Sequence, residues 1–135
     1  MKRLLLAFAV LLASFVLPAA AAEKAGTVVI HPGETLYLRF ETVGKKFKLL
    51  SSSKEKDEQA QVIFTFTVDE QKVFNQVKVE NKFPQDLTYK VEARSLSLKR
   101  KMIMPTTPVV GGKMAFEDFP KPVEQLAIFD FRLVK

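Results

Sequence analysis

Residues 61–68 have the sequence QVIFTFTV, which is the strongest indication of fold in the chain. In an extended segment Val62, Phe64 and Phe66 point to one side, and the residues between them point to the other. β-Branched and aromatic residues favour strands, and the run is short for a helix. The segment therefore predicts a β-strand that buries its Val62, Phe64 and Phe66 face.

The same alternation of apolar and polar positions recurs along the chain, and a helical period is almost absent. Further strands are predicted at residues 27–30, 36–40, 46–50, 73–79, 87–93, 95–104, 113–119 and 125–134. In the last of these, strict alternation places Phe129 and Phe131 together on the inward face. Turn signals of unequal spacing separate the strands. We therefore expect an all-β fold, an immunoglobulin-like antiparallel β-sandwich of seven to nine strands, with a small β-barrel as the alternative.

One part of this pattern resembles a known family. The segment Val77-Lys78-Val79-Glu80-Asn81, the polar bend after it and Leu87-Thr88-Tyr89 resemble the paired core strands of bacterial immunoglobulin-like domains. The chain lacks the cysteine pair and the core tryptophan of antibody-type domains. The resemblance thus implies a fold class and no activity.

The start of the chain has the pattern of a secretory signal peptide. Two basic residues precede an uncharged apolar run at 4–17, and an alanine-rich segment ending at Ala22 offers a cleavage site. The run is shorter than the ~20 residues of a membrane-spanning helix. We expect residues 1–22 to be removed and residues 23–135 to form a single β-sandwich domain without a transmembrane segment.

Composition narrows the class of protein further. The chain has 47% hydrophobic and 27% charged residues, a formal net charge of +6 and no cysteine. It is too apolar for a disordered protein, and it can form neither a disulfide scaffold nor a thiolate metal site. A small exported domain without disulfides suits the bacterial periplasm, since small domains of the eukaryotic extracellular space rely on disulfides. A periplasmic or secreted location is expected.

Groups suited to catalysis are few. The single histidine, His31, precedes Pro32-Gly33 at the end of a predicted strand, and no serine lies in a G-x-S-x-G motif. Adjacent acids such as Asp57-Glu58 point to opposite sides of an extended chain and do not converge on a substrate. We expect no enzyme activity. A pair of acids from distant strands leaves a small hydrolase as one alternative.

Three methionines form a candidate metal site. Met102 and Met104 share one face of a predicted strand, and Met114 comes close to Met104 if residues 105–112 connect two paired strands. Three thioethers, with His31 as a fourth ligand, would suit Cu(I). The competing interpretation is that these methionines fill gaps in the core. No cofactor is therefore expected, and copper is the alternative.

A basic run is the second candidate site. Lys99, Arg100 and Lys101 lie in the same predicted strand, and alternation puts Arg100 on the face of Met102 and Met104. A bulge, a strand end or an edge-protecting charge would explain a cation in this apolar row. The functional interpretation is contact with an anionic component of the cell envelope.

These patterns favour binding over catalysis. The chain lacks the dense basic stripe and stacking aromatic residues of nucleic-acid binders, so no nucleic-acid partner is expected. We expect a periplasmic interaction module that binds an envelope protein or polymer. A soft-metal carrier that uses the methionines and a small hydrolase are the alternatives.

Overall fold

The structure, a computed structural model, describes residues 24–134. All regular elements in this range are strands: β1 (Val28–Ile30), β2 (Thr35–Val43), β3 (Lys46–Ser53), β4 (Val62–Thr67), β5 (Phe74–Asn81), β6 (Asp86–Ser95), β7 (Arg100–Met104), β8 (Met114–Pro120) and β9 (Gln125–Val134). No helix in the described range is long and apolar enough to cross a membrane. The expected signal peptide lies outside the described residues.

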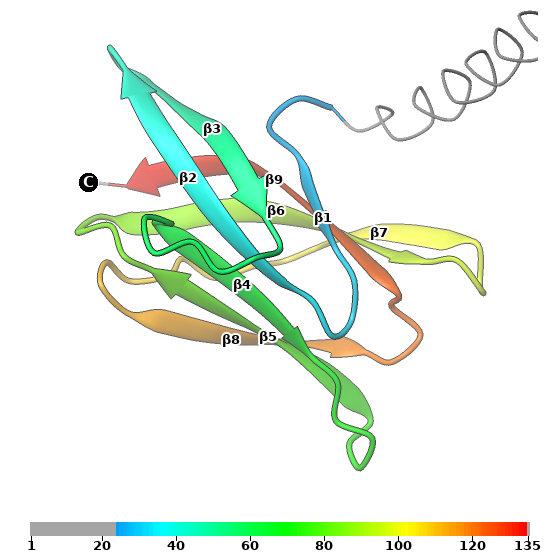
Figure 1. The fold of residues 1–135 in the computed structure, drawn as a ribbon. Coiled ribbons are helices and arrows are strands. Elements are labelled where there is room, and N and C mark those ends of the chain that lie inside the picture. Colours follow the sequence, from blue (N-terminus) through cyan, green and yellow to red (C-terminus); the bar gives the residue numbers. More distant parts are fainter. Residues whose placement is uncertain (1–23, 135) are drawn as a thin grey trace, which may run out of the picture.

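The nine strands form two antiparallel sheets that pack face to face (Figure 1). One sheet has four strands in the order β1-β9-β6-β7, and the other has five in the order β3-β2-β4-β5-β8. The predicted all-β sandwich is confirmed, and the two sheets are separate and do not close into one barrel.

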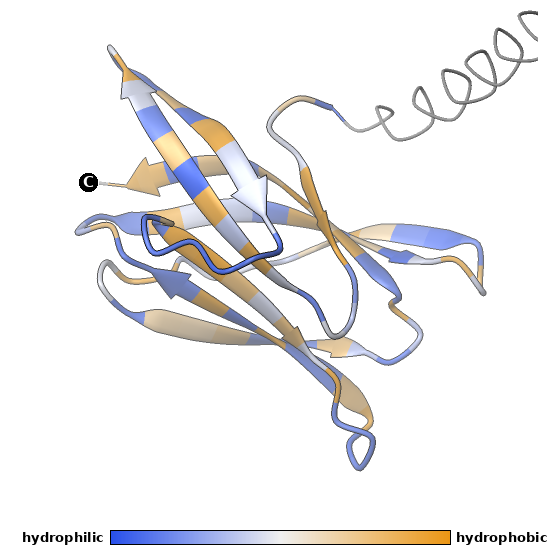
Figure 2. Cartoon of the chain, viewed as in Figure 1, coloured by the Kyte–Doolittle hydropathy of each residue, from blue (hydrophilic) through white to orange (hydrophobic). Residues whose placement is uncertain are grey.

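The core lies between the sheets and is rich in phenylalanine. Phe64 is fully buried, with its ring centroid 5.3 Å from that of Tyr89 in an edge-to-face arrangement. Hydrophobic and hydrophilic residues alternate along β2, as the colour bands of Figure 2 show. The predicted inward face of Val62, Phe64 and Phe66 is confirmed, since all three side chains are buried.

The predicted inward position of Phe129 is wrong, because a β-bulge shifts the register of β9. Lys90 pairs with Phe129, and Thr88 pairs with Arg132. Tyr89 on β6 therefore lies opposite two residues of β9, Asp130 and Phe131. The inserted residue, Asp130, has a φ of 53°, a left-handed conformation that Asp tolerates better than most residues. The bulge turns Phe131 into the core and leaves Phe129 partly exposed.

A second correction concerns the segment that resembles immunoglobulin-like domains. β5 and β6 do not pair with each other, because the bend between them takes the chain from one sheet to the other. The buried side chain of Asn81 holds this bend. Its Nδ2 donates to the carbonyl oxygens of Gln85 at 2.8 Å and Val109 at 3.0 Å, and its Oδ1 accepts from the N–H of Phe83 at 3.0 Å. One amide thus links the bend to the segment that precedes β8.

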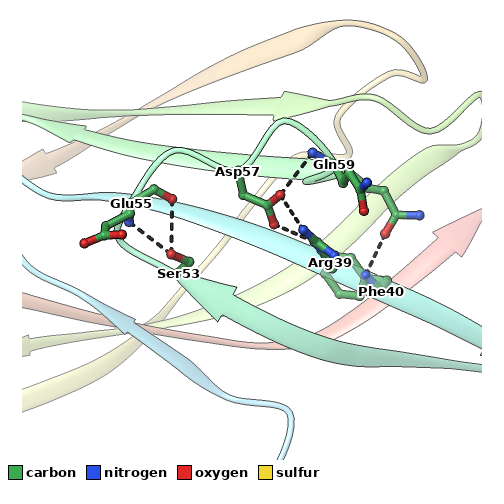
Figure 3. A network of polar contacts seen from close by, with 7 residues as sticks. Arg39, Phe40, Ser53, Glu55, Asp57 and Gln59 are labelled. Atoms are coloured by element: carbon green, nitrogen blue, oxygen red, sulfur yellow. Dashed lines mark hydrogen bonds and ion pairs between the residues drawn. The ribbon is translucent and has the colours of Figure 1, made fainter.

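An ion pair holds the connection from β3 to β4, which passes over β2. Arg39 on β2 donates from Nε and Nη2 to the two carboxylate oxygens of Asp57, at 2.6 Å and 2.7 Å (Figure 3). These hydrogen bonds hold the pKa of the Asp57 carboxyl below its usual value. The connection is fixed further where Gln61 Oε1 accepts from the N–H of Phe40 at 2.6 Å.

Candidate functional site

The candidate site lies at the β7 edge of the four-stranded sheet. In the described part of the chain β7 pairs only with β6, so its other edge has no neighbouring strand. Met102 lies opposite Ala93 and Met104 opposite Val91. Ala93 and Val91 are core residues, so the two methionines lie on the strand face that continues the inner surface of the sandwich.

A largely apolar groove of about 530 Å³ lies beside this face. One wall is the β6–β7 hairpin, and the other is the turn between β8 and β9. The apolar residues that line it are Ala93, Leu98, Met102, Met104, Pro120, Pro122 and Val123. Ser95, Lys99, Arg100 and Lys101 complete the lining.

Hydrogen bonds from Glu124 hold the two walls in place. Its carboxylate accepts from the N–H of Ser97 at 3.0 Å and from the Ser97 hydroxyl at 2.6 Å. These bonds lower the pKa of the Glu124 carboxyl. The backbone N–H of Glu124 also donates to the carbonyl oxygen of Arg94 at 3.0 Å. The groove is therefore built by fixed contacts between two segments distant in sequence.

Several apolar side chains around the groove remain in water. Met102 is 65% exposed and Leu98 is 56% exposed, while Met104 packs partly against the core. On the opposite face of β7, Ile103 is 55% exposed. Isolated exposed apolar residues are ordinary in soluble domains, but here several of them gather beside one groove.

The basic run sits where the hairpin turns. Lys99 belongs to the turn, with a φ of 51°, and β7 begins at Arg100. Of the three explanations for a cation in the apolar row, the structure supports the strand end and the charge at a sheet edge, since β7 begins at Arg100 and is an edge strand, whereas the β6–β7 register shows no bulge. Within residues 24–134, the side chains of Lys99, Arg100 and Lys101 form no hydrogen bond or ion pair. The groove thus has an apolar floor and a cluster of unpaired cations at one end.

The structure does not bring the three methionines together. Met104 pairs with Val91 in the four-stranded sheet, whereas Met114 pairs with Glu80 in the five-stranded sheet. Residues 105–112 therefore connect strands of different sheets, and the condition for a three-thioether copper site is not met. Only Met102 and Met104 share the groove.

The structure also separates His31 from the methionines. The residue before it, Ile30, pairs with Leu126, which pairs with Ala93, which in turn pairs with Met102. Three strand spacings amount to roughly 14 Å, too far for shared coordination. In the residues that the structure describes, no group of three or more His, Asp or Glu side chains could hold a metal ion.

His31 belongs instead to a polar cluster at the β1–β2 turn. Its Nδ1 lies 2.9 Å from Glu34 Oε1, its backbone N–H donates to the same oxygen at 2.8 Å, and Lys54 Nζ lies 2.6 Å from Glu34 Oε2. Burial by itself raises the pKa of Glu34, but the contacts with Lys54 and His31 outweigh it and lower the pKa to about 2. The cluster closes a turn and is not part of the groove.

This low pKa predicts a dependence of stability on pH. The folded-state pKa of Glu34 lies below the unfolded value of about 4.3, so its contribution is present above pH ~5 and is lost as pH falls towards 2. Glu34→Gln is expected to lower the free energy of unfolding at pH 7 by on the order of 1 kcal/mol, because Lys54 is largely solvent-screened. Urea unfolding of both proteins between pH 7 and pH 2 measures the difference, which should shrink steadily from pH 5 towards the acid end.

Glu58, an exposed acid outside this polar cluster, provides the control. Glu58→Gln removes the same charge from the connection between β3 and β4 and should leave the pH dependence unchanged. A constant difference between Glu34→Gln and the unmodified protein across the range would contradict the cluster described above.

The chain matches no protein-family model, no curated protein and no solved structure.

Sequence reasoning found one half of the groove and missed the other. It placed Leu98, Met102, Met104 and the basic run on one predicted strand, residues 95–104, but residues 96–99 form the hairpin turn and β7 begins only at Arg100. It did not find the turn that contains Pro120 and Pro122. The two prolines follow a predicted strand, so from the sequence they indicate only that the strand ends in a turn. No pattern in the sequence indicates that this turn faces the β6–β7 hairpin.

Proposed function

We propose that this protein is an exported interaction module of the cell envelope that binds a partner in the groove beside β7. The observation that carries the proposal is the combination of an open apolar groove with three cations at its end, whose side chains pair with no group among residues 24–134. Apolar side chains lose contact with water when a partner covers them, which favours association. The unpaired cations favour a partner with apolar and anionic groups next to each other.

The residues of the groove support binding in preference to catalysis. Its lining contains no carboxylate and no imidazole, and its single hydroxyl belongs to Ser95. That hydroxyl oxygen accepts from the N–H of Leu98 at 3.3 Å and lies 3.4 Å from Ser97 Oγ. A serine without a nearby general base is a poor nucleophile.

Export is the second part of the proposal and rests on the sequence pattern of residues 1–22. A cysteine-free domain held together by its phenylalanine core is suited to a compartment where unpaired thiols would be oxidised. The partner is therefore proposed to be a protein or polymer of the envelope.

Site-specific photo-cross-linking of the full chain tests both parts. A photoreactive phenylalanine analogue at Leu98 is expected to give an adduct of defined mass in the periplasmic or envelope fraction. Mass spectrometry of the same material should find Glu23 as the first residue. The matched control is the analogue at Phe116, which is exposed on β8 and does not line the groove.

Equal adducts from Leu98 and Phe116 would contradict a binding site in the groove. An intact Met1 on the accumulated protein would contradict export with cleavage. The two results are independent: the cross-links test binding in the groove, and the mass of the N-terminus tests export with cleavage.

A further inference from the structure

We propose that the partner binds by strand addition, as an extended acidic–apolar peptide segment that pairs with the open edge of β7 and places apolar side chains in the groove. This inference rests on the proposed function and names the chemistry and geometry of the partner. It follows from three features: a strand edge whose segment Met102–Met104 carries no charge, an apolar groove on one side of it and cations at one end.

The edge of β7 differs from the other sheet edges in the described residues. β1 has three residues, β3 carries a bulge and the lysines Lys46 and Lys48, and β8 carries two acids and ends at Pro120. Short length, bulges, charges and proline all discourage pairing with a further strand. These three edges therefore carry the usual protection against unwanted strand pairing.

β7 lacks this protection over most of its length. Its charges are confined to Arg100 and Lys101, and the segment Met102–Met104 is uncharged and apolar on both faces. In an antiparallel pair every second residue directs its N–H and C=O away from the partner, so the outer edge of β7 has backbone groups available for a further strand. Such an edge is a template for an extended peptide.

The groove and the charges together define the side chains of the added strand. A strand beside β7 would lie about 4.8 Å away, with its alternate side chains over the groove. Apolar residues are favoured opposite Met102 and Met104, and an acidic residue is favoured opposite Arg100. On the other face an acid is favoured opposite Lys101 and a β-branched residue opposite Ile103. The partner segment thus has two adjacent acids next to an alternating apolar run. The acids come first in the partner sequence for parallel addition and last for antiparallel addition.

This charge pattern favours a different chain over a second copy of this one. Pairing β7 with β7 of a second molecule would bring two basic runs into one interface without adding an acid from either strand. A lipid could offer an anionic group and an apolar chain, but it has no backbone to pair with the strand edge. An acidic peptide satisfies the edge, the groove and the cations together.

Synthetic peptides test the inference on the folded domain, residues 23–135. The probes are the capped peptides Val-Thr-Val-Glu-Glu and Glu-Glu-Val-Thr-Val, which represent antiparallel and parallel addition. Calorimetry gives the dissociation constant, and NMR hydrogen exchange reports protection of the β7 amides. At least one probe is expected to bind and to protect β7, and replacing both Glu by Gln should weaken binding about tenfold.

N-Methylated peptides separate strand addition from simple occupation of the groove. A strand pairs through one of its two edges, so methylation of one alternating set of backbone nitrogens should abolish binding, while methylation of the other set should leave it nearly unchanged. Equal binding by both methylated peptides would overturn strand addition. The groove would then still be the binding site, so the proposed function would survive.

Protein variants locate the binding site with matched controls. The triple variant Lys99→Glu, Arg100→Glu, Lys101→Glu should lose peptide binding. The control triple Lys45→Glu, Lys46→Glu, Lys48→Glu makes the same change of charge in the β2–β3 hairpin, at a different end of the molecule (Figure 1), and should bind normally. Met102→Glu should also lose binding, whereas Phe116→Glu on β8 should not. All of these side chains are solvent-exposed, so folding is expected to be preserved.

Other occupants would give distinct results. A concentration-dependent dimer in sedimentation, lost in the Lys99–Lys101 triple variant, would identify a second copy and overturn the proposal. Equal affinity for phosphatidylglycerol vesicles and for the peptides would favour a lipid surface and overturn it as well. A cross-link at Leu98 in cells together with no binding by any peptide would reject this partner chemistry while leaving the proposed function in place.

Discussion

Replacing Phe66 by alanine is expected to lower the free energy of unfolding by about 3 to 5 kcal/mol. Phe66 is 1% exposed, and its ring lies 6.3 Å from that of Phe119, between the two sheets. Alanine would leave a cavity that rigid neighbouring strands cannot fill. The free energy of unfolding of a small domain is about 5 to 15 kcal/mol in total, so this loss is a large share of its stability. Urea unfolding followed by circular dichroism measures it.

Phe129→Ala is the matched control, because strict alternation predicts the same cost for both phenylalanines. The bulge at Asp130 turns Phe129 away from the core, so we expect this variant to lose only about 1 kcal/mol. Similar losses in the two variants would contradict the position of the bulge. A near-native stability of Phe66→Ala would contradict the assignment of the inner face of β4.

The contrast between Phe66 and Phe129 shows what alternation along a strand can predict. Where pairing is regular, as in β4, the period of two assigns the buried face correctly. One extra residue in a bulge reverses every side chain beyond it. Asp130 tolerates a left-handed φ, but many Asp residues in strands do not adopt one. The sequence therefore predicts the strand at the end of the chain, but not the change of face within it.

The same limit applies to the candidate site. Alternation correctly put Arg100 on the face of Met102 and Met104, because that relation lies within one strand. It could not predict that Met114 enters the other sheet, or that Pro120 and Pro122 face the hairpin, since these relations depend on strand order. Strand order is set by packing between distant segments, which local patterns do not record.

Replacing Gly111 by alanine is expected to cost about 3 kcal/mol of stability through a backbone clash. A Cβ at this position would overlap the carbonyl oxygen and carbon of Pro84. Neither segment can move away easily. The N–H of Gly111 donates to Asp86 Oδ1 at 2.9 Å, and the N–H of Gly112 donates to the carbonyl oxygen of Phe83 at 2.8 Å. Relieving the clash would therefore break hydrogen bonds that hold the bend between the sheets.

Gly44→Ala separates this steric cost from the cost of a left-handed backbone. Gly44 has a φ of +64° with no atom near the added Cβ, whereas Gly111 does not have a left-handed φ. We expect Gly44→Ala to lose about 1 kcal/mol through backbone strain alone. Gly111→Ala should lose clearly more, and amide exchange should speed up at Phe83 and Val109, where the bend meets the segment before β8. If Gly111→Ala lowered the free energy of unfolding no more than Gly44→Ala, the close approach of residues 84 and 111 would be wrong. A clash with the Pro84 carbonyl would have to add a loss of stability that Gly44→Ala does not have.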